Sequence, residues 1–312
     1  MQLDSTRITV RERTLGEILD LALHVLREYF QPWLATTLLA VIPLALINYA
    51  LIGWMADSTY VSYEDGEAPL RFLWNMTLLV YLEAPLAGIV SIGYLGPAVF
   101  LERRTIRQVL IETLQRAPQW VWCQLFLRGI LPAWILLLIV NVWYRLQFNG
   151  LIEGFLLPAL VGYASLFRAL RPYVNEIILL ERLPTRSANP SEMTLGRRSA
   201  NLQGQYSGDL VVRFILASLV GMLLWAALCI STLVLLMFLF NSGDLTIVDM
   251  FQRFDITWYH AQLVYPAILW SIAGYFSVVE YLDYLDLRIK HEGWEVELLM
   301  RAEGLRLAGK TW

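Results

Sequence analysis

Three ionisable side chains stand inside long apolar stretches of the sequence, where a charge is costly and therefore suggests a function. Glu83 lies in the middle of one stretch, just before Pro85, which removes a backbone donor and can open a helix locally. Arg128 lies early in another stretch, and Glu280 lies near the end of a further one. Together, Glu83, Arg128 and Glu280 could form a polar path for a substrate or a proton.

The same residues also have a structural interpretation. Glu83 and Arg128 can form a buried ion pair that fixes the register of two neighbouring helices, while Glu280 and Asp283 reach water at the end of their stretch. Transporters commonly contain inverted repeats with paired broken helices. The sequence shows no such repeat, and we therefore favour the structural interpretation.

Residue patterns typical of catalysis or metal binding are missing from the sequence. His260 is expected at the opposite end of the helices from His24 and His291, and Cys123 and Cys229 lie in apolar stretches, where thiols behave as small hydrophobes. The sequence contains no Ser-His-Asp arrangement, no cysteine pair at metal spacing and no glycine loop for phosphate. We therefore expect no enzyme activity, no metal and no cofactor.

Six apolar stretches must position these side chains. They cover residues 33–55, 72–101, 120–144, 151–167, 211–240 and 260–284. Most reach the roughly 20 residues that a helix needs to cross a bilayer. The composition agrees, with 57% hydrophobic and only 16% charged residues. The first stretch begins too late for a cleaved signal, so it should be retained. The sequence predicts an all-α, polytopic helical membrane protein with six transmembrane helices.

Basic residues alternate between the loops and so predict the orientation of the chain. They gather in the N-terminal segment, the second and fourth loops and the C-terminal tail, whereas the first, third and fifth loops hold only Arg71, Arg145 and Arg253. Because basic loops stay on the cytoplasmic side, both termini should be cytoplasmic. One domain, 1–312, would comprise a segment 1–32, a bundle 33–285 with cytoplasmic loops 102–119 and 168–210, and a tail 286–312.

Short amphipathic helices are expected on the cytoplasmic side. Thr14 and Glu17 match a capping box before an apolar stripe, and a second stripe over 106–117 ends before Pro118. Residues 195–202 could form a short basic helix. Such helices either bury their apolar face among lipid headgroups or dock on the ends of the bundle itself.

Three segments together resemble a known bacterial family. They are 14–20, 195–202 with its Arg198-Ser199 pair, and the tail 284–295. In this order they are similar to the glycerophosphoryl diester phosphodiesterase membrane domain family and its YciC-like relatives. The resemblance implies a six-span helical module and assigns no activity. Ala200 stands where that family usually has tryptophan. The phosphodiesterase itself needs a soluble barrel of about 250 residues, for which the spans leave no room.

The arginine-rich side is the candidate functional surface. Its candidate contacts for lipid headgroups or a partner are Arg103, Arg107, Arg197, Arg198 and Arg288. We expect a non-enzymatic scaffold or subunit of an envelope-associated system that binds anionic headgroups or a partner protein there. The alternative is a small-solute or lipid transporter using Glu83, Arg128 and Glu280. The net charge of -3 gives no reason to expect nucleic acid.

Overall fold

The computed structural model describes residues 13–56, 68–99, 104–145, 148–185, 192–204, 207–239 and 260–292, and these are helical with short connections. The α-helices are α1 (Leu15–Glu28), α2 (Phe30–Ile52), α3 (Ala68–Val99), α4 (Ile106–Gln115), α5 (Ala117–Trp120), α6 (Ile130–Trp143), α7 (Leu157–Leu170), α8 (Val174–Glu176), α9 (Leu195–Gly204), α10 (Ser207–Leu239) and α13 (Tyr265–Glu292). A 3-10 turn, η1 (Gly53–Ala56), and the π-helical segments η2 (Val121–Leu127), η3 (Ile152–Leu156), η4 (Ile177–Glu181) and η5 (His260–Val264) complete them.

Five of these helical stretches are long and apolar enough to cross a membrane. They are Phe30–Ala56, Leu70–Val99, Ile152–Leu170, Ser207–Leu236 and Gln262–Lys290. The remaining predicted span, 120–144, is a pair of helices, Ala117–Leu127 and Ile130–Trp143, bent by 56° where they meet. The prediction of an all-α polytopic membrane protein is confirmed, with six spans when the bent pair counts as one.

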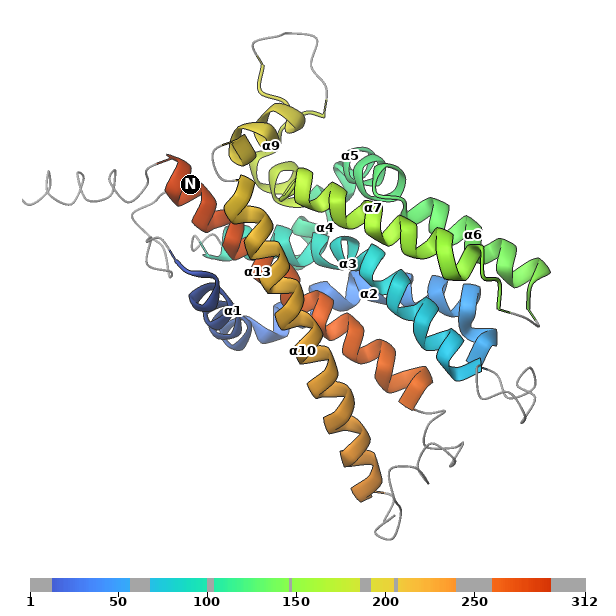
Figure 1. The fold of residues 1–312 in the computed structure, drawn as a ribbon. Helices are drawn as coiled ribbons and strands as arrows, with labels where there is room; N and C mark the ends of the chain where they lie inside the picture. Colours follow the sequence, from blue (N-terminus) through green and yellow to red (C-terminus); the bar gives the residue numbers. More distant parts are fainter. Residues whose placement is uncertain are drawn as a thin grey trace, which may run out of the picture.

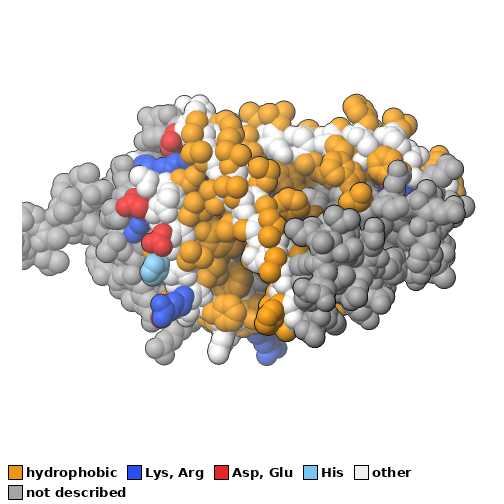
Figure 2. All heavy atoms as spheres, turned by 60° about the horizontal axis from the view of Figure 1, so that its bottom comes forward, with side chains coloured by type: hydrophobic (Ala, Val, Ile, Leu, Met, Phe, Trp, Pro, Cys, Tyr) orange, Lys and Arg blue, Asp and Glu red, His pale blue; other side chains and the backbone are white. Residues whose placement is uncertain are grey.

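Helix α3 forms the centre of the bundle and packs between α2 and α13 (Figure 1). In its apolar part 78% of the residues are buried, whereas none are buried in the corresponding part of α10. Helix α10 leans away from the bundle (Figure 1) and presents apolar side chains over its length. Figure 2 shows a broad apolar surface with charged side chains gathered at one end. This arrangement suits a helix bundle surrounded by lipid.

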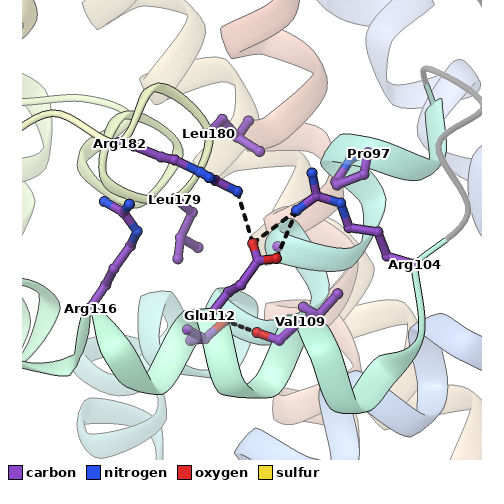
Figure 3. Close-up of a pocket in the computed structure, with 10 residues that line it drawn as sticks. Pro97, Arg104, Val109, Glu112, Arg116, Leu179, Leu180 and Arg182 are labelled. Atoms are coloured by element: carbon purple, nitrogen blue, oxygen red, sulfur yellow. Dashed lines mark hydrogen bonds and ion pairs between the residues drawn. The ribbon is translucent and has the colours of Figure 1, made fainter.

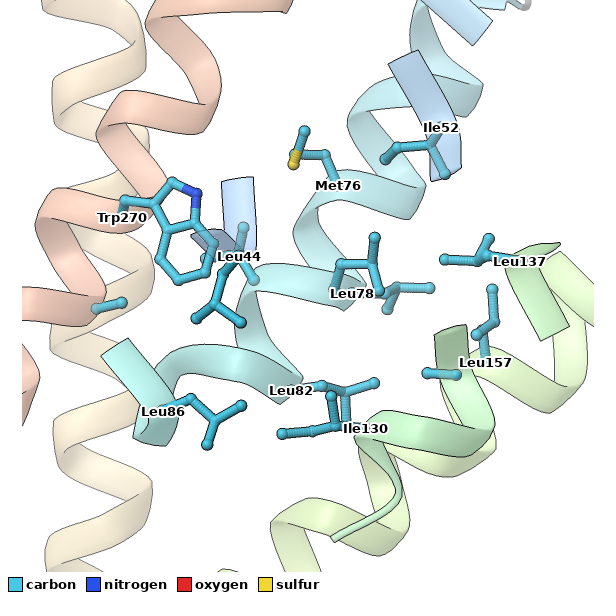
Figure 4. Packing of buried hydrophobic residues seen from close by; sticks show 14 of the residues in the cluster. Leu44, Ile52, Met76, Leu78, Leu82, Leu86, Ile130, Leu137, Leu157 and Trp270 are labelled. Atoms are coloured by element: carbon cyan, nitrogen blue, oxygen red, sulfur yellow. The ribbon is translucent and has the colours of Figure 1, made fainter. Parts of the chain in front are cut away.

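Two apolar clusters hold the bundle together. One joins α2, α3, α6, α7 and α13 and includes Leu82, Ile130, Leu137 and Leu157, which lie close together in Figure 4. The backbones of α3 and α13 also approach closely, because a Cβ atom on Gly88 would lie only 2.6 Å from the Cβ atom of Ser277. Small residues allow such close helix contacts in membranes.

The short helices near the arginine-rich end dock on the bundle. Helix α1 begins with the predicted capping box of Thr14 and Glu17 and buries Ile18, Ala22 and Val25 in the cluster that contains α13. Helix α4 begins with a second capping box, from Thr105 and Gln108, and also buries one face, and α9 forms where a basic helix is predicted. Docking on the bundle therefore accounts for part of the apolar faces of these helices, while Ile111 and Leu114 of α4 stay exposed.

Candidate functional site

A cavity of about 200 Å³ lies between the end of α3, helix α4 and segment η4. We call it the arginine pocket. Its lining residues are Gly93, Pro97, Arg104, Val109, Glu112, Thr113, Arg116, Leu179, Leu180 and Arg182. Figure 3 shows that Arg104, just before α4, and Arg182, just after η4, reach the Glu112 carboxylate, whereas Arg116 lies apart from it at the end of α4.

Local structure brings these side chains together. Helical spacing buries Val109 and Thr113 against α3 and leaves Glu112 and Arg116, one turn apart, along the pocket. After η4 the backbone of Arg182 has a φ of 59°, a left-handed conformation that is uncommon for residues other than glycine. The chain turns at this point, and the Arg182 guanidinium reaches across to α4.

The pocket carries an excess of positive charge. Glu112 accepts hydrogen bonds from Arg104 Nη1 at 2.8 Å and from Arg182 Nη2 at 3.0 Å, while Arg116 donates to the Ile178 carbonyl at 3.4 Å. Burial and the nearby Arg182 lower the pKa of Arg116, and Glu112 opposes this shift. The described lining residues include three arginines and one carboxylate, which together carry a formal charge of +2. Guanidinium groups in this arrangement suit a phosphate, which they bind through paired hydrogen bonds.

The five arginines proposed from the sequence divide into three groups. Arg103 lies outside the described residues. Arg107 and Arg197 are exposed. Arg198 and Arg288 instead turn inward to Glu181, with nitrogen–oxygen distances of 2.7 and 3.7 Å. These last two arginines therefore belong to an internal cluster and are not part of an open basic surface.

Glu181 and Asp286 connect distant parts of the chain at one end of the bundle. Tyr284 donates its hydroxyl hydrogen bond to Glu181, which links η4, α9 and α13. The Arg13 amide donates to Asp286 at 2.7 Å, and Arg213 also pairs with Asp286, at 3.1 Å. The first and last described residues therefore lie at the same end of the bundle.

The predicted ion pair between Glu83 and Arg128 is not formed. Glu83 is fully buried and accepts hydrogen bonds from Asn48 at 2.7 Å and Trp134 at 2.6 Å. These two neutral donors occupy the positions around the carboxylate that an arginine would need. Hydrogen bonds, and not an ion pair, therefore fix the register of the helices at Glu83. Glu280 pairs with Arg168 at 2.7 Å, and its side chain is 21% exposed.

Arg128 lies at a helix break beside a second break. The bent pair of helices meets at Arg128 and Gly129, whose φ is 90°, and α7 is separated from α8 by Tyr173, whose φ is 59°. Gln124 donates to Asn175 at 2.8 Å, and Asn175 donates to the Pro85 carbonyl at 2.9 Å, so both breaks lie against α3. One broken span, which the sequence did not reveal, is therefore present among the described residues, and a turn that follows the span of α7 lies beside it.

The sequence marks the arginine pocket only weakly. The amphipathic pattern over 106–117 places Glu112 and Arg116 on a polar face, which is a usable signal. Arg104 and Arg182 appear there only as two of many basic loop residues. The approach of Arg182 to Glu112 depends on the left-handed turn at Arg182, which no sequence motif predicts.

Within the described ranges, no group of three or more His, Cys, Asp or Glu residues could hold a metal ion. No family model matches the chain, and no curated protein or solved structure matches it significantly. The resemblance to the glycerophosphoryl diester phosphodiesterase membrane domain family therefore stays a hypothesis based on the three segments.

Proposed function

We propose that this chain is a non-enzymatic, multi-pass protein of a bacterial inner membrane, a scaffold or subunit of an envelope-associated system, that binds the phosphate of an anionic lipid in its arginine pocket. The observation that carries the proposal is the excess charge of that pocket, with Arg104, Arg116 and Arg182 around Glu112. A partner protein could reach the exposed Arg107 and Arg197 on the same side.

The position of the pocket favours a lipid as the source of the phosphate. Gly93 and Pro97 lie in the last turns of α3, whose membrane-spanning stretch ends at Val99. The pocket therefore lies where a span leaves the apolar layer and headgroups begin. Leu179 and Leu180 form part of its wall, and their side chains suit the apolar part of a lipid next to its phosphate.

The lipid test uses a double variant, Arg116→Gln with Arg182→Gln, in nanodiscs that contain phosphatidylglycerol. Each basic residue near an anionic surface contributes about 1 kcal/mol, so we expect lipid affinity to fall more than tenfold by native mass spectrometry. The matched control, Arg107→Gln with Arg197→Gln, removes two exposed arginines and should change the affinity less.

Two outcomes contradict this assignment. Equal lipid affinity in wild type and the pocket variant would show that the pocket does not bind lipid. Inorganic phosphate and glycerol 3-phosphate form the second arm of the test. Binding of these soluble phosphates without any binding of phosphatidylglycerol would make the ligand a soluble phosphate compound and not a lipid.

The orientation of the protein has its own prediction. Single cysteines at Ser62 and Ser242 should label with an impermeant reagent from outside spheroplasts, in a background without Cys123 and Cys229, whereas a cysteine at Ser191 should not. The loop arginines motivate this expectation. All three serines lie outside the described residues. Labelling of Ser191 from outside would reverse the proposed orientation.

The transporter alternative draws support from the one broken span, which bends at Arg128 and Gly129, because transporters commonly contain broken helices. A transport path also needs polar space that is continuous through the bundle. Glu83 is enclosed by its hydrogen bonds, Glu280 is paired with Arg168, and the cavity beside Arg128 measures about 10 Å³. We therefore retain lipid binding as the main proposal.

A further inference from the structure

The arginines of the arginine pocket differ in how closely they pair with its carboxylate. Glu112 accepts two hydrogen bonds from Arg104, at 2.8 and 3.1 Å, and one from Arg182 at 3.0 Å (Figure 3). Arg116 donates instead to the backbone carbonyl of Ile178. Arg104 and Glu112 therefore form the closest ion pair. Arg116 and Arg182 contribute the two positive charges that the described lining residues leave in excess.

Arg116 and Arg182 still have hydrogen-bond donors to offer a ligand. A guanidinium group has five N–H donors, and each of these two side chains makes one hydrogen bond, that of Arg116 at the long distance of 3.4 Å. Burial, followed by the nearby charge of Arg182, lowers the pKa of Arg116. A ligand with two negative charges would relieve the repulsion between these two side chains and accept bonds from both.

The rest of the pocket wall offers little to the alcohol of a lipid headgroup. Val109, Leu179 and Leu180 are apolar, and the hydroxyl group of Thr113 donates to the Val109 carbonyl at 2.8 Å. The Glu112 carboxylate already accepts three hydrogen bonds. A headgroup alcohol inside this space would lose water without gaining equivalent hydrogen bonds, which is unfavourable. A terminal phosphate group brings no such alcohol with it.

We propose that the arginine pocket prefers a phosphomonoester lipid, of which phosphatidic acid is the simplest, to phosphodiester lipids such as phosphatidylglycerol. This inference rests on the lipid binding proposed above and specifies its ligand. A phosphomonoester has three terminal oxygens and a charge of about −1.5 to −2 at pH 7, which matches the charges of Arg116 and Arg182. A phosphodiester has one charge on two such oxygens and leaves one of the two arginines unbalanced.

Native mass spectrometry of the full chain tests this preference in nanodiscs that contain phosphatidic acid or phosphatidylglycerol at equal mole fraction. At low salt we expect phosphatidic acid to bind about tenfold more tightly, which corresponds to one additional hydrogen bond between charged groups. Arg116→Gln should reduce the preference to less than about twofold, because one arginine charge then faces either phosphate. Arg107→Gln is the matched control and should keep the full preference.

The pH dependence of the wild-type protein supplies a second test that needs no variant. The second pKa of a phosphomonoester is about 6, so lowering the pH from about 7.5 to about 5.5 removes roughly three quarters of its dianion. The affinity for phosphatidic acid should therefore fall about fourfold. The phosphate of phosphatidylglycerol does not titrate in this range, so its affinity reports any effect of pH on the protein itself.

The outcomes separate this inference from the lipid binding on which it rests. Phosphatidic acid that binds no more tightly than phosphatidylglycerol, with both lost in Arg116→Gln with Arg182→Gln, would overturn the preference and leave lipid binding standing. An equal pH dependence for the two lipids would also overturn the preference. If that double variant binds both lipids as the wild type does, then both proposals fail.

A soluble competitor distinguishes the lipid from a free phosphomonoester. Glycerol 3-phosphate carries the same phosphate group without acyl chains. If it displaces phosphatidic acid at equal concentration, then the ligand is a soluble phosphomonoester and the lipid assignment is wrong. Phosphatidic acid that stays bound under these conditions would support the lipid as the ligand of the arginine pocket.

Discussion

Replacing Glu153 with alanine is expected to lower the free energy of unfolding by about 3–5 kcal/mol, the typical loss when one partner of a buried ion pair is removed. Glu153 is fully buried in η3 and accepts hydrogen bonds from Arg71 Nε at 2.8 Å, Asn75 at 2.9 Å and the Asn149 amide at 2.7 Å. The Arg71 side chain is only 10% exposed. Without Glu153, the Arg71 guanidinium would keep its hydrogen bonds to backbone carbonyl groups but would lose the negative charge that balances it.

A double-mutant cycle tests this interpretation by thermal and denaturant unfolding in detergent. Arg71→Met combined with Glu153→Met should be less damaging than the sum of the two single changes, because no buried charge is left alone. Glu28→Ala removes an exposed carboxylate and should change stability by no more than about 0.5 kcal/mol. Strictly additive losses of stability would mean that the two side chains do not stabilise each other and that each contributes only through its own packing.

Replacing Glu181 with alanine is expected to cost about 3 kcal/mol and to loosen α9. Glu181 accepts hydrogen bonds from Arg198 and Tyr284 and lies 3.7 Å from Arg288. The Glu181 and Arg198 side chains are only 11% and 13% exposed, so solvent screens the pair weakly. Loss of the carboxylate leaves two arginines close together, and they repel one another.

Hydrogen exchange of the backbone amides measures the loosening of α9 directly. The amides of α9 should exchange faster in Glu181→Ala, and Arg198→Gln should produce a similar change. Arg197→Gln is the matched control, since Arg197 is exposed, and it should leave α9 protected. If Arg197→Gln and Arg198→Gln have equal effects, then the cluster at Glu181 does not secure α9.

The cluster at Glu181 also changes how basic residues in this chain should be tested. Arg197 and Arg198 are adjacent in the sequence and look equivalent as headgroup contacts. Only Arg197 is exposed, so a variant that neutralises both would mix lost stability with lost binding. The exposed pair Arg107 and Arg197 is therefore the cleaner measure of a surface contribution.

The helical spans and the helix starts near the arginine-rich end can be predicted from the sequence. Spans follow from the length of apolar stretches, and the capping box at Thr14 and Glu17 follows from residues three apart. Both properties depend on residues that are close together in the sequence, so they can be predicted without knowing the tertiary structure. The six-span arrangement and the short basic helix α9 could be predicted for this reason.

Which polar groups meet depends on how helices that are distant in the sequence pack together. Glu83 was expected to face Arg128, yet it bonds to Asn48 and Trp134, because a rotation of about 100° per residue makes pairing sensitive to the orientation and register of each helix. Arg182 reaches Glu112, which lies far away in the sequence, only through a left-handed turn. The hydrophobicity of a segment determines whether it crosses the membrane as a helix. Packing between helices determines how deep its charged side chains lie and which way they point.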